Sequence, residues 1–330
     1  MDTLKTIVDN IDISRSNLNG TCISFDRLSI RDVYNISEPK LNEISTRFSL
    51  SNFELPKIMG YNSLVFYANS NIDGVINKLA IKIAVIYKND ESIIDSIHKL
   101  VSDNGISPKI YYDCTINFNS KNYIIKLIMC ERVIPFADFE WISDVQMKNS
   151  ILILIEKTLL LHTMGYVHND IKYENLGLDE KGNIYIFDFD NFTVITKKSC
   201  SKKNSSSMCH PPDDLIKTSI SHGLGNCIID LFSIVSIILG NIIGIRDWKF
   251  NNEQLYEKKV RISSFNRGKT HKLMQNIISQ KFSTTCYSQF WYSLMNFVHL
   301  IFQKNIKIIN KRGFTVRSRK LIKRMKTDLE

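Results

Sequence analysis

Between residues 166 and 190 the chain carries side chains whose types and spacing suit phosphoryl transfer. The run Tyr166–Leu178 reads YVHNDIKYENLGL, and a strand-like run at 183–187 leads directly to Asp188, Phe189 and Asp190. Moving a phosphoryl group requires a cation on the phosphates, a divalent metal held by carboxylate and amide oxygens, and a carboxylate that positions the acceptor hydroxyl. This short segment supplies each of these groups.

The elements upstream of this segment read as a small antiparallel sheet with one helix. The β-rich runs Ser63–Tyr67 and Leu79–Ile86 are separated by the turn-prone stretch Asn69–Gly74. Apolar residues at helical spacing predict a helix over 90–103. Two further apolar runs, at 109–112 and 123–129, are expected to return to the sheet.

The second half of the chain reads as mainly helical. Helical spacing over 145–164 ends at Gly165, and helical patterns dominate from residue 226 onward. The run Cys227–Ile245 is nearly long enough to span a membrane. It contains Asp230, and a charge within a span is costly, so we expect a buried helix of a large folded domain and no membrane span.

Composition favours a folded protein inside the cell. The 330 residues are 44% hydrophobic and 23% charged, with a net charge of +10 that favours an acidic or phosphorylated partner. The seven cysteines are odd in number and form no CxxC pair, which indicates thiols in a reducing compartment rather than a disulfide framework. The N-terminal residues lack the apolar run of a secretory signal, so we expect an intracellular, cytoplasmic location.

The HxDxKxxN pattern, the intervening strand and the DFx triplet together resemble the catalytic and metal-binding loops of the eukaryotic protein kinase superfamily. The resemblance implies that Asp170 orients the acceptor hydroxyl and that Lys172 steadies the γ-phosphate of ATP. It also implies that Asn175 and Asp188 hold Mg²⁺ or Mn²⁺. Lys172, two residues after Asp170, resembles the serine/threonine branch of the superfamily.

The run Leu79–Lys82 (LAIK) resembles the VAIK strand of protein kinases. In that family the lysine contacts the α- and β-phosphates, and the alanine helps to bound the adenine site, which implies these roles for Lys82 and Ala80. The lysine pairs with a glutamate on the following helix. Glu91 is the expected partner here, with Asp95 as the competing candidate.

Two weaker matches complete the expected ATP site. The phosphate-covering loop GxGxxGxV matches residues 58–65 (IMGYNSLV) only at its middle glycine, so the expected contacts there are Ile58, Gly60 and Val65. The run 128–132 (IMCER) resembles the hinge between the kinase lobes. That match places Cys130 at the entrance to the adenine site and Glu131 beside it.

Further downstream, Cys209–Asp214 (CHPPDD) loosely resembles the APE motif that closes the activation segment, and Ile229–Ile234 resembles the DxWS pattern of the buried central helix. In the family this aspartate supports the backbone of the catalytic loop, which implies a structural role for Asp230. The expected fold is therefore α+β and bilobed, kinase-like, with an antiparallel-sheet N-lobe and a mainly helical C-lobe. We expect an N-terminal extension over 1–45 and a kinase domain over 46–330, divided at about 131/132.

Three departures from the family pattern bear on activity. Asn169 replaces the arginine that commonly precedes the catalytic aspartate, so control by activation-loop phosphorylation is less expected. Asp190 replaces the glycine of DFG and adds a carboxylate near the metal site. The phosphate-covering loop has lost glycines that permit close backbone approach. Such variants resemble divergent kinases of large DNA viruses, poxvirus-like, which extends the expected location to the host cytoplasm or the virion.

Three functions remain open from the sequence. The leading one is an active serine/threonine kinase with a protein substrate. The second is a pseudokinase that binds partners, and the third is a small-molecule phosphotransferase of the aminoglycoside or choline kinase type. The basic segment 304–326 is either a solvated helix face or a docking patch for an acidic or phosphorylated partner. No nucleic-acid motif and no aromatic platform accompany the positive charge.

Overall fold

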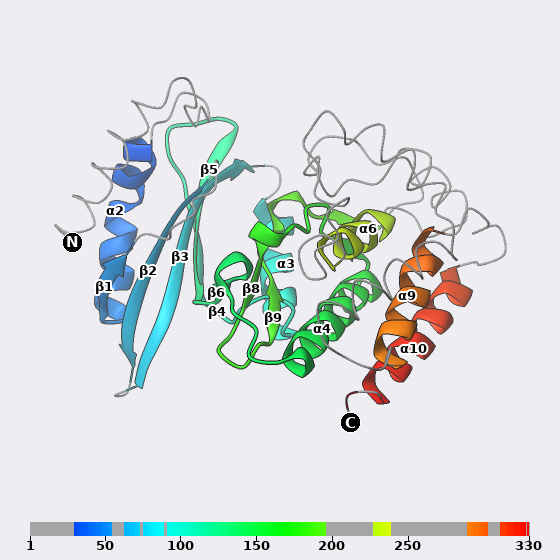
Figure 1. The fold of residues 1–330 in the computed structure, drawn as a ribbon. Coiled ribbons are helices and arrows are strands. Elements are labelled where there is room, and N and C mark those ends of the chain that lie inside the picture. The colour runs from blue at the N-terminus through cyan, green and yellow to red at the C-terminus, as the bar shows by residue number, and fades with distance from the viewer. Residues whose placement is uncertain are drawn as a thin grey trace, which may run out of the picture. The chain divides into compact units, whose positions relative to one another are not determined.

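The computed structural model describes residues 30–54, 63–72, 75–88, 91–195, 227–238, 289–302, 311–327 and 329. The chain divides into two compact units, Met1–Val133 and Ile134–Glu330 (Figure 1). The first unit is built on an antiparallel sheet, and the described helices of the second are α4, α6, α9 and α10. The α+β class and its order, sheet first and helices later, are as predicted.

The sheet unit contains five strands in the spatial order β1-β2-β3-β5-β4, with two helices. All neighbouring strands are antiparallel. The bounds of its elements are α2 (Ile30–Arg47), β1 (Leu50–Glu54), β2 (Ser63–Ile72), β3 (Val75–Tyr87), α3 (Glu91–Asp103), β4 (Ile110–Ile116) and β5 (Tyr123–Glu131).

The hairpin of β2 and β3 is longer than predicted. The two strands pair continuously from Ser63 opposite Ala84 to Ile72 opposite Val75. The stretch Asn69–Ile72 is therefore strand, and the expectation that a loop begins at Asn69 is wrong. Polar residues there keep the strand conformation because an unbroken ladder of backbone hydrogen bonds satisfies their N–H and C=O groups.

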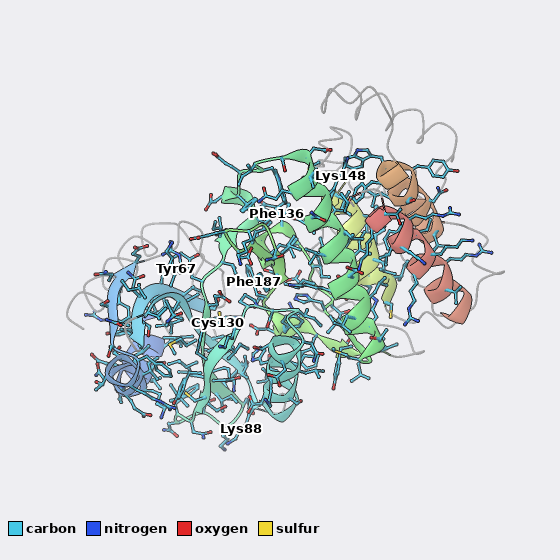
Figure 2. The ribbon with its side chains drawn as sticks, turned by 90° about the horizontal axis from the view of Figure 1, so that it is seen from below. Tyr67, Lys88, Cys130, Phe136, Lys148 and Phe187 are labelled. Atoms are coloured by element: carbon cyan, nitrogen blue, oxygen red, sulfur yellow. The ribbon has the colours of Figure 1, made fainter. Side chains whose placement is uncertain are left out.

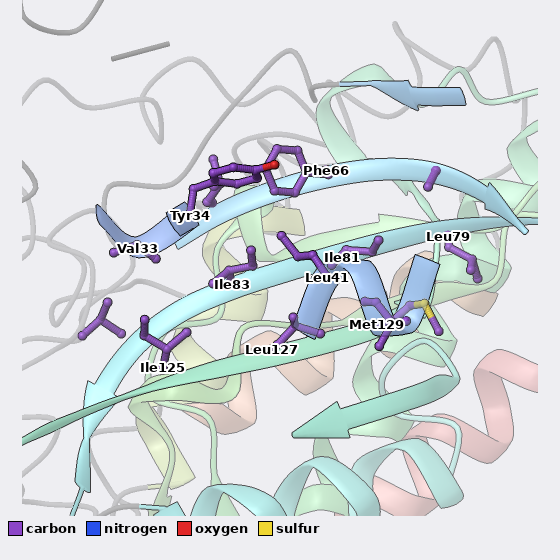
Figure 3. Packing of buried hydrophobic residues seen from close by; sticks show 14 residues of the cluster. Val33, Tyr34, Leu41, Phe66, Leu79, Ile81, Ile83, Ile125, Leu127 and Met129 are labelled. Atoms are coloured by element: carbon purple, nitrogen blue, oxygen red, sulfur yellow. The ribbon is translucent and has the colours of Figure 1, made fainter. Parts of the chain in front are cut away.

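Helix α2 covers one face of this sheet (Figure 3). Its side chains Tyr34, Leu41 and Ile44 pack against alternate residues of the strands, among them Leu79, Ile81, Ile83, Ile125, Leu127 and Met129. Burying an apolar side chain such as Leu41 contributes about 1.5–3 kcal/mol relative to leaving it exposed. Part of the expected N-terminal extension is thus in the core of the sheet unit.

The periodicity of α2 is weak for two local reasons. Ser37 lies on the buried side, where its Oγ donates to the carbonyl of Val33 at 2.7 Å, so a polar residue interrupts the apolar stripe. Pro39 lies inside the helix and lacks the backbone N–H that a helix uses. Both features weaken the helical pattern in the sequence, although tertiary packing stabilises the helix.

The second unit combines helices with short strands. Its strands form a two-stranded sheet, β10-β7, and a three-stranded sheet, β6-β8-β9. The bounds of its elements are β6 (Ile134–Pro135), η2 (Phe136–Asp138), α4 (Asp144–Thr163), β7 (Tyr166–Val167), η3 (Tyr173–Asn175), β8 (Leu176–Leu178), β9 (Ile184–Ile186), η4 (Phe189–Asn191), β10 (Thr193–Val194), α6 (Cys227–Ile237), α9 (Gln289–Phe302) and α10 (Lys311–Thr327).

Helices α4 and α6 confirm two predictions. Helix α4 begins after Ser143, whose Oγ caps the helix by accepting from Gln146 N at 3.1 Å, and it ends before Gly165 at φ +94°. Every residue of α6 is buried, as predicted for the apolar run around Asp230. Among the helices that the structure describes, none is long and apolar enough to cross a membrane. The described cysteines, Cys114, Cys130 and Cys227, are free thiols.

Candidate active site

The loop between β7 and β8 brings Asp170, Lys172 and Asn175 together. Asp170 is buried, and its Oδ2 accepts a hydrogen bond from Lys172 Nζ at 2.8 Å. Asn175 Nδ2 donates to the backbone carbonyl of Asp170 at 2.9 Å and to its Oδ2 at 3.2 Å. The Asp170 carboxylate is therefore held in place from two directions, and a carboxylate so fixed can accept a proton from a hydroxyl placed next to it.

The charge of Lys172 is set by its neighbours. Burial by itself lowers the pKa of Lys172. The hydrogen bond to Asp170, followed by the negative charges of Asp170 and Asp188, outweighs burial and raises this pKa above its usual value. Lys172 therefore remains a cation close to both carboxylates, and such a cation can neutralise a phosphate group.

Asn175 and Asp188 lie at the ends of two adjacent strands. Asn175 comes directly before β8, which pairs with β9, and Asp188 follows β9. The N–H of Phe187 donates to the carbonyl of Asn175 at 3.0 Å, which joins the two loops. Asp188 adopts a left-handed backbone, at φ 66°, a conformation that L-residues other than Asn and Asp rarely take. The left-handed turn therefore sets the orientation of the Asp188 side chain, and aspartate adopts this backbone conformation more readily than most residues.

These two residues fit the divalent metal that the sequence motif implies. Asn175 uses its amide nitrogen for the bonds to Asp170, so its amide oxygen is the atom left for a metal. One amide oxygen and one carboxylate are typical protein ligands of Mg²⁺ or Mn²⁺ when phosphates supply further oxygens. Asp190 lies two residues further along, in η4.

Asp230 of α6 holds the backbone of the loop that carries Asp170. Its side chain is fully buried, and it accepts from the N–H of His168 through Oδ2 and from the N–H of Asn169 through Oδ1, both at 2.8 Å. His162 Nε2 lies 3.0 Å from the same Oδ2. Burial alone lowers the pKa of His162, but Cys227 and Asp230 outweigh burial and raise that pKa to about 10. The Asp230 carboxylate thus faces a charged imidazolium and two peptide N–H groups.

His168 links the loop that carries Asp170 to the segment that carries Asp188. The imidazole Nε2 lies 3.0 Å from the carbonyl oxygen of Phe187, and its ring packs edge-on against Phe189 at 4.6 Å between centroids. Both His168 and Phe189 are buried. These contacts couple the position of Asp188 to that of Asp170.

Asn169, which stands where an arginine is common, also connects these two segments. Its side-chain Nδ2 donates to the carbonyl of Asn191 at 2.9 Å and to Thr193 Oγ1 at 2.8 Å. Its backbone is left-handed, at φ 66°. The Asn169 amide therefore connects the loop that carries Asp170 directly to η4 and β10, without a phosphate group between them.

In the sheet unit, strand alternation places Val65, Ala80 and Lys82 on one face. Lys82 is opposite Val65 on β2 and Ile128 on β5, and Ala80 is opposite Tyr67 and Cys130. These side chains alternate with the residues that pack under α2, so they lie on the other face of the sheet. We call Val65, Tyr67, Ala80, Lys82 and Cys130 the sheet-face patch (Figure 2 labels two of them, Tyr67 and Cys130). It brings together three of the predicted nucleotide contacts.

The two hinge residues differ in their place on β5. Burial raises the pKa of the Cys130 thiol to about 12, although the charge of Lys82 opposes this, so the thiol stays protonated beside Lys82. Glu131 pairs with Leu79, so alternation places its side chain on the opposite face from Cys130. The N–H of Glu131 donates to the carbonyl of Lys109 at 2.8 Å.

Helix α3 is attached to the sheet by a lysine that the sequence did not single out. Lys126 of β5, with a side chain only 3% exposed, bridges the carboxylates of Asp95 on α3 and Asp113 on β4. Asp95, the competing candidate for pairing with Lys82, is thus bound to Lys126. Glu91 begins α3, and its side chain lies outside the described residues.

Sequence reasoning missed His162, Lys126 and the side-chain role of Asn169. His162 precedes Gly165 at the end of a predicted helix, and a histidine on that buried side was the available signal. Lys126 interrupts an otherwise apolar strand, which marked a buried cation in need of partners. Several predicted features, namely Ile58, Gly60 and the segment 209–214, lie outside the described residues.

Comparisons with known proteins found a curated viral relative and similar solved structures. The chain is 27% identical over 124 residues to serine/threonine-protein kinase 1 of Heliothis zea nuclear polyhedrosis virus, a match that covers 37% of this chain and 46% of the viral protein. The chain thus matches less than half of the length of that curated relative. Among solved structures, the Cydia pomonella granulovirus kinase PK-1 aligns with a TM-score of 0.47 and 19% identity, over 67% of this chain and 79% of that one. No family model matches the chain.

Proposed function

We propose that this chain, which is similar over 124 residues to a viral serine/threonine-protein kinase, transfers the γ-phosphoryl group of ATP to serine or threonine hydroxyls of a protein substrate. The observation that carries the proposal is the hydrogen-bonded group of Asp170, Lys172 and Asn175. It combines a fixed carboxylate, a cation and an amide within one loop. Those are the groups that phosphoryl transfer asks of a protein.

On the acceptor side, Asp170 accepts or orients the proton of the attacking hydroxyl. Lys172, kept cationic by Asp170 and Asp188, neutralises charge on the transferred phosphoryl group. When Lys172 turns to the phosphate, Asn175 still holds the Asp170 carboxylate through its amide nitrogen. Positioning and charge neutralisation are the main contributions that the protein makes to this reaction.

On the nucleotide side, Lys82 contacts the α- and β-phosphates, while Val65 and Ala80 pack against adenine. Their common place on the sheet-face patch supports this assignment. Ile58, Gly60 and the backbone of Glu131 complete the proposed contacts, and Glu91 pairs with Lys82. Mg²⁺ or Mn²⁺, held by Asn175 and Asp188, would neutralise phosphate charge when bound.

Transfer assays with the full-length chain test the proposal. The protein is incubated with labelled ATP, Mg²⁺ and either casein or a basic protein, beside Asp170→Asn and, as a matched control, Asp103→Asn on the exposed end of α3. We expect Asp170→Asn to lower the transfer rate about 100-fold or more, the usual contribution of a positioned base, and Asp103→Asn to leave it unchanged. Equal rates in all three proteins contradict the proposal.

The second candidate function is a pseudokinase, and the glycine-poor loop with Asp190 is the observation that favours it. Thermal unfolding with and without millimolar ATP and Mg²⁺ distinguishes the two. Binding to the native state must raise the apparent melting temperature, and Lys82→Met should reduce that increase. No increase together with no transfer favours the pseudokinase. Phosphate transfer to an aminoglycoside or choline but to no protein would instead indicate a small-molecule phosphotransferase.

A further inference from the structure

Helix α10 packs through one side only. Ser318, Ile322 and Met325 are buried, and they are spaced three or four residues apart, so they share one side of the helix. Lys326 Nζ lies 2.7 Å from Glu156 Oε1, which connects α10 to α4. The apolar side of α10 is therefore already covered within its own unit (Figure 1).

The other side of α10 is predominantly basic. Six cationic residues are exposed there: Arg317, Arg319, Lys320, Lys323, Arg324 and Lys326. The sequence of α10, KRGFTVRSRKLIKRMKT, contains no acidic residue. Within the part of the chain that the structure describes, Lys326 alone among the six makes an ion pair. At 100° per residue these six side chains spread over the exposed half of the helix, and we call them the α10 cationic face.

The density of charge on this face decides what kind of partner fits it. Residues 317–326 span about 14 Å at the helical rise of 1.5 Å per residue, so the face carries about one cation per 2–3 Å. Double-helical nucleic acid carries about one phosphate per 1.7 Å, which is a comparable density. Like charges at i,i+3 and i,i+4, such as Lys320 with Lys323 and Arg324, repel one another, and a polyanion relieves that repulsion.

The exposed side of α10 suits phosphates better than a lipid surface. A helix that lies in a membrane interface exposes an apolar face, whereas Ile322 and Met325 of α10 are buried in the protein. Val316 is the one exposed large hydrophobic side chain of α10 among the described residues. Three of the six cations are arginines, whose planar guanidinium groups match the oxygens of a phosphate.

We propose that the α10 cationic face binds the phosphate backbone of nucleic acid, independently of base sequence. Such binding requires no recognition motif, because counterion release from the phosphates supplies the free energy. The proposal goes beyond the phosphotransferase function and does not depend on it. Binding on α10 would concentrate the protein on nucleic acid together with any substrate that is bound there.

Fluorescence anisotropy with the full-length chain tests the proposal. The probes are a labelled 20-base-pair DNA duplex and a 20-nucleotide RNA, each in two unrelated sequences and titrated from 50 to 300 mM salt. We expect the two sequences to bind equally and the affinity to fall steeply with salt. The variant Arg319→Gln/Lys320→Gln/Lys323→Gln should weaken duplex binding on the order of 10- to 100-fold at about 100 mM salt and reduce the log–log salt slope by about 2–3.

The matched control removes three charges elsewhere. The triple variant Lys88→Gln/Lys121→Gln/Lys181→Gln changes exposed lysines far along the chain from α10 and carries the same net charge as the test variant. We expect the log–log salt slope of this control variant to differ from the wild-type slope by no more than the equivalent of about one phosphate contact. Equal weakening in both variants, or no binding at 50 mM salt, overturns the proposal.

Two competing anions complete the test. Polyglutamate and vesicles with anionic lipid are offered at matched charge concentration as competitors of the duplex. We expect unlabelled duplex to displace the probe at least tenfold better than either. If polyglutamate or the vesicles compete as well as the duplex, and lose this ability in the α10 variant, the face binds acidic protein or membrane and the nucleic-acid proposal is wrong.

Discussion

Lys126 in the sheet unit and Asp230 in the helical unit are buried charged side chains that join segments distant in the sequence, but the two charges are held differently. Lys126 of the sheet unit is bound by two carboxylates, Asp95 and Asp113, whose side chains are 47% and 22% exposed. Asp230 of the helical unit is fully buried and is bound by the backbone N–H groups of two successive residues and by an imidazole.

This difference in bonding partners determines which part of the structure each charged side chain holds in place. The ion pairs of Lys126 set where α3 lies against the sheet, and water reaches their outer atoms. The burial of Lys126 alone would lower its pKa, but Asp113 and Asp95 raise it above the usual value. Hydrogen bonds from two consecutive peptides fix a backbone conformation instead, including the left-handed turn at Asn169. An ion pair positions a helix, whereas Asp230 shapes the loop that carries Asp170.

The largest effect is expected for Asp230→Ala. The change leaves two buried N–H groups and the His162 cation without their acceptor, so the free energy of unfolding should fall by about 3–5 kcal/mol. Urea denaturation measures the change. Asp230→Asn, which preserves volume and one acceptor oxygen, should lose clearly less. A loss below about 1 kcal/mol for the alanine variant would show that water replaces the carboxylate at little cost.

A smaller loss, about 1–3 kcal/mol, is expected for Lys126→Met. The methionine fills a similar volume, and Asp95 and Asp113 can turn toward solvent because both are partly exposed. Urea denaturation of Lys126→Met, Asp95→Asn and the double variant should show that the two changes are not additive. If Lys126→Met lowers the free energy of unfolding as much as Asp230→Ala does, the two buried charges do not differ in the way we infer.

The third prediction concerns pH. The pKa of His162 is raised from 6.5 to about 10 in the folded protein, so protonated His162 stabilises the fold fully below pH 6.5. This contribution is lost as the pH rises from 6.5 through about 10. The difference in unfolding free energy between wild type and His162→Gln should therefore shrink toward high pH.

Comparing wild type with His162→Gln cancels the opposing contribution of another, partly buried group, Lys157. Burial lowers the pKa of Lys157 to about 8, so Lys157 alone makes the fold more stable as the pH rises through 8 toward its unfolded value. Lys157 is present in both proteins, and its effect cancels. A difference that stays constant from pH 7 to 10.5 would mean that His162 is neutral beside Asp230.

The smallest effect is expected for Asn169→Gly, about 1–2 kcal/mol. Glycine removes the two side-chain hydrogen bonds to Asn191 and Thr193 but accepts the left-handed backbone. Asn169→Ala should lose roughly 1 kcal/mol more, because alanine adds strain at positive φ. Equal stability of the two variants in urea would show that backbone conformation at residue 169 matters less than we infer.

The proximity of Asp170, Lys172 and Asn175 could be predicted because these residues lie within six positions of the chain. A hairpin of two short strands, β8 and β9, carries the chain on to Asp188. The common face of Val65, Ala80 and Lys82 follows from the register between β2 and β3, which the structure gives, together with the side-chain period of two along each strand. Periodicity also predicted α3 and α4 with small errors at their ends, and the apolar run from Cys227 predicted α6.

What only the tertiary structure decided depends on contacts between distant segments. The sequence of α2 contains Pro39 and a buried Ser37, so its helix is held by packing on the sheet rather than by its own propensity. The partners of Lys126 come from α3 and β4, and those of Asn169 from η4 and β10. The basic run 304–326 was compatible with a solvated helix face and with a docking patch, and only the burial of Ile322 and Met325 shows which side of α10 faces outward. The sequence by itself determined the order of the charged residues and the hydrophobic periodicity of each element. The tertiary structure determined which of the charged side chains come into contact, because their partners lie on distant segments.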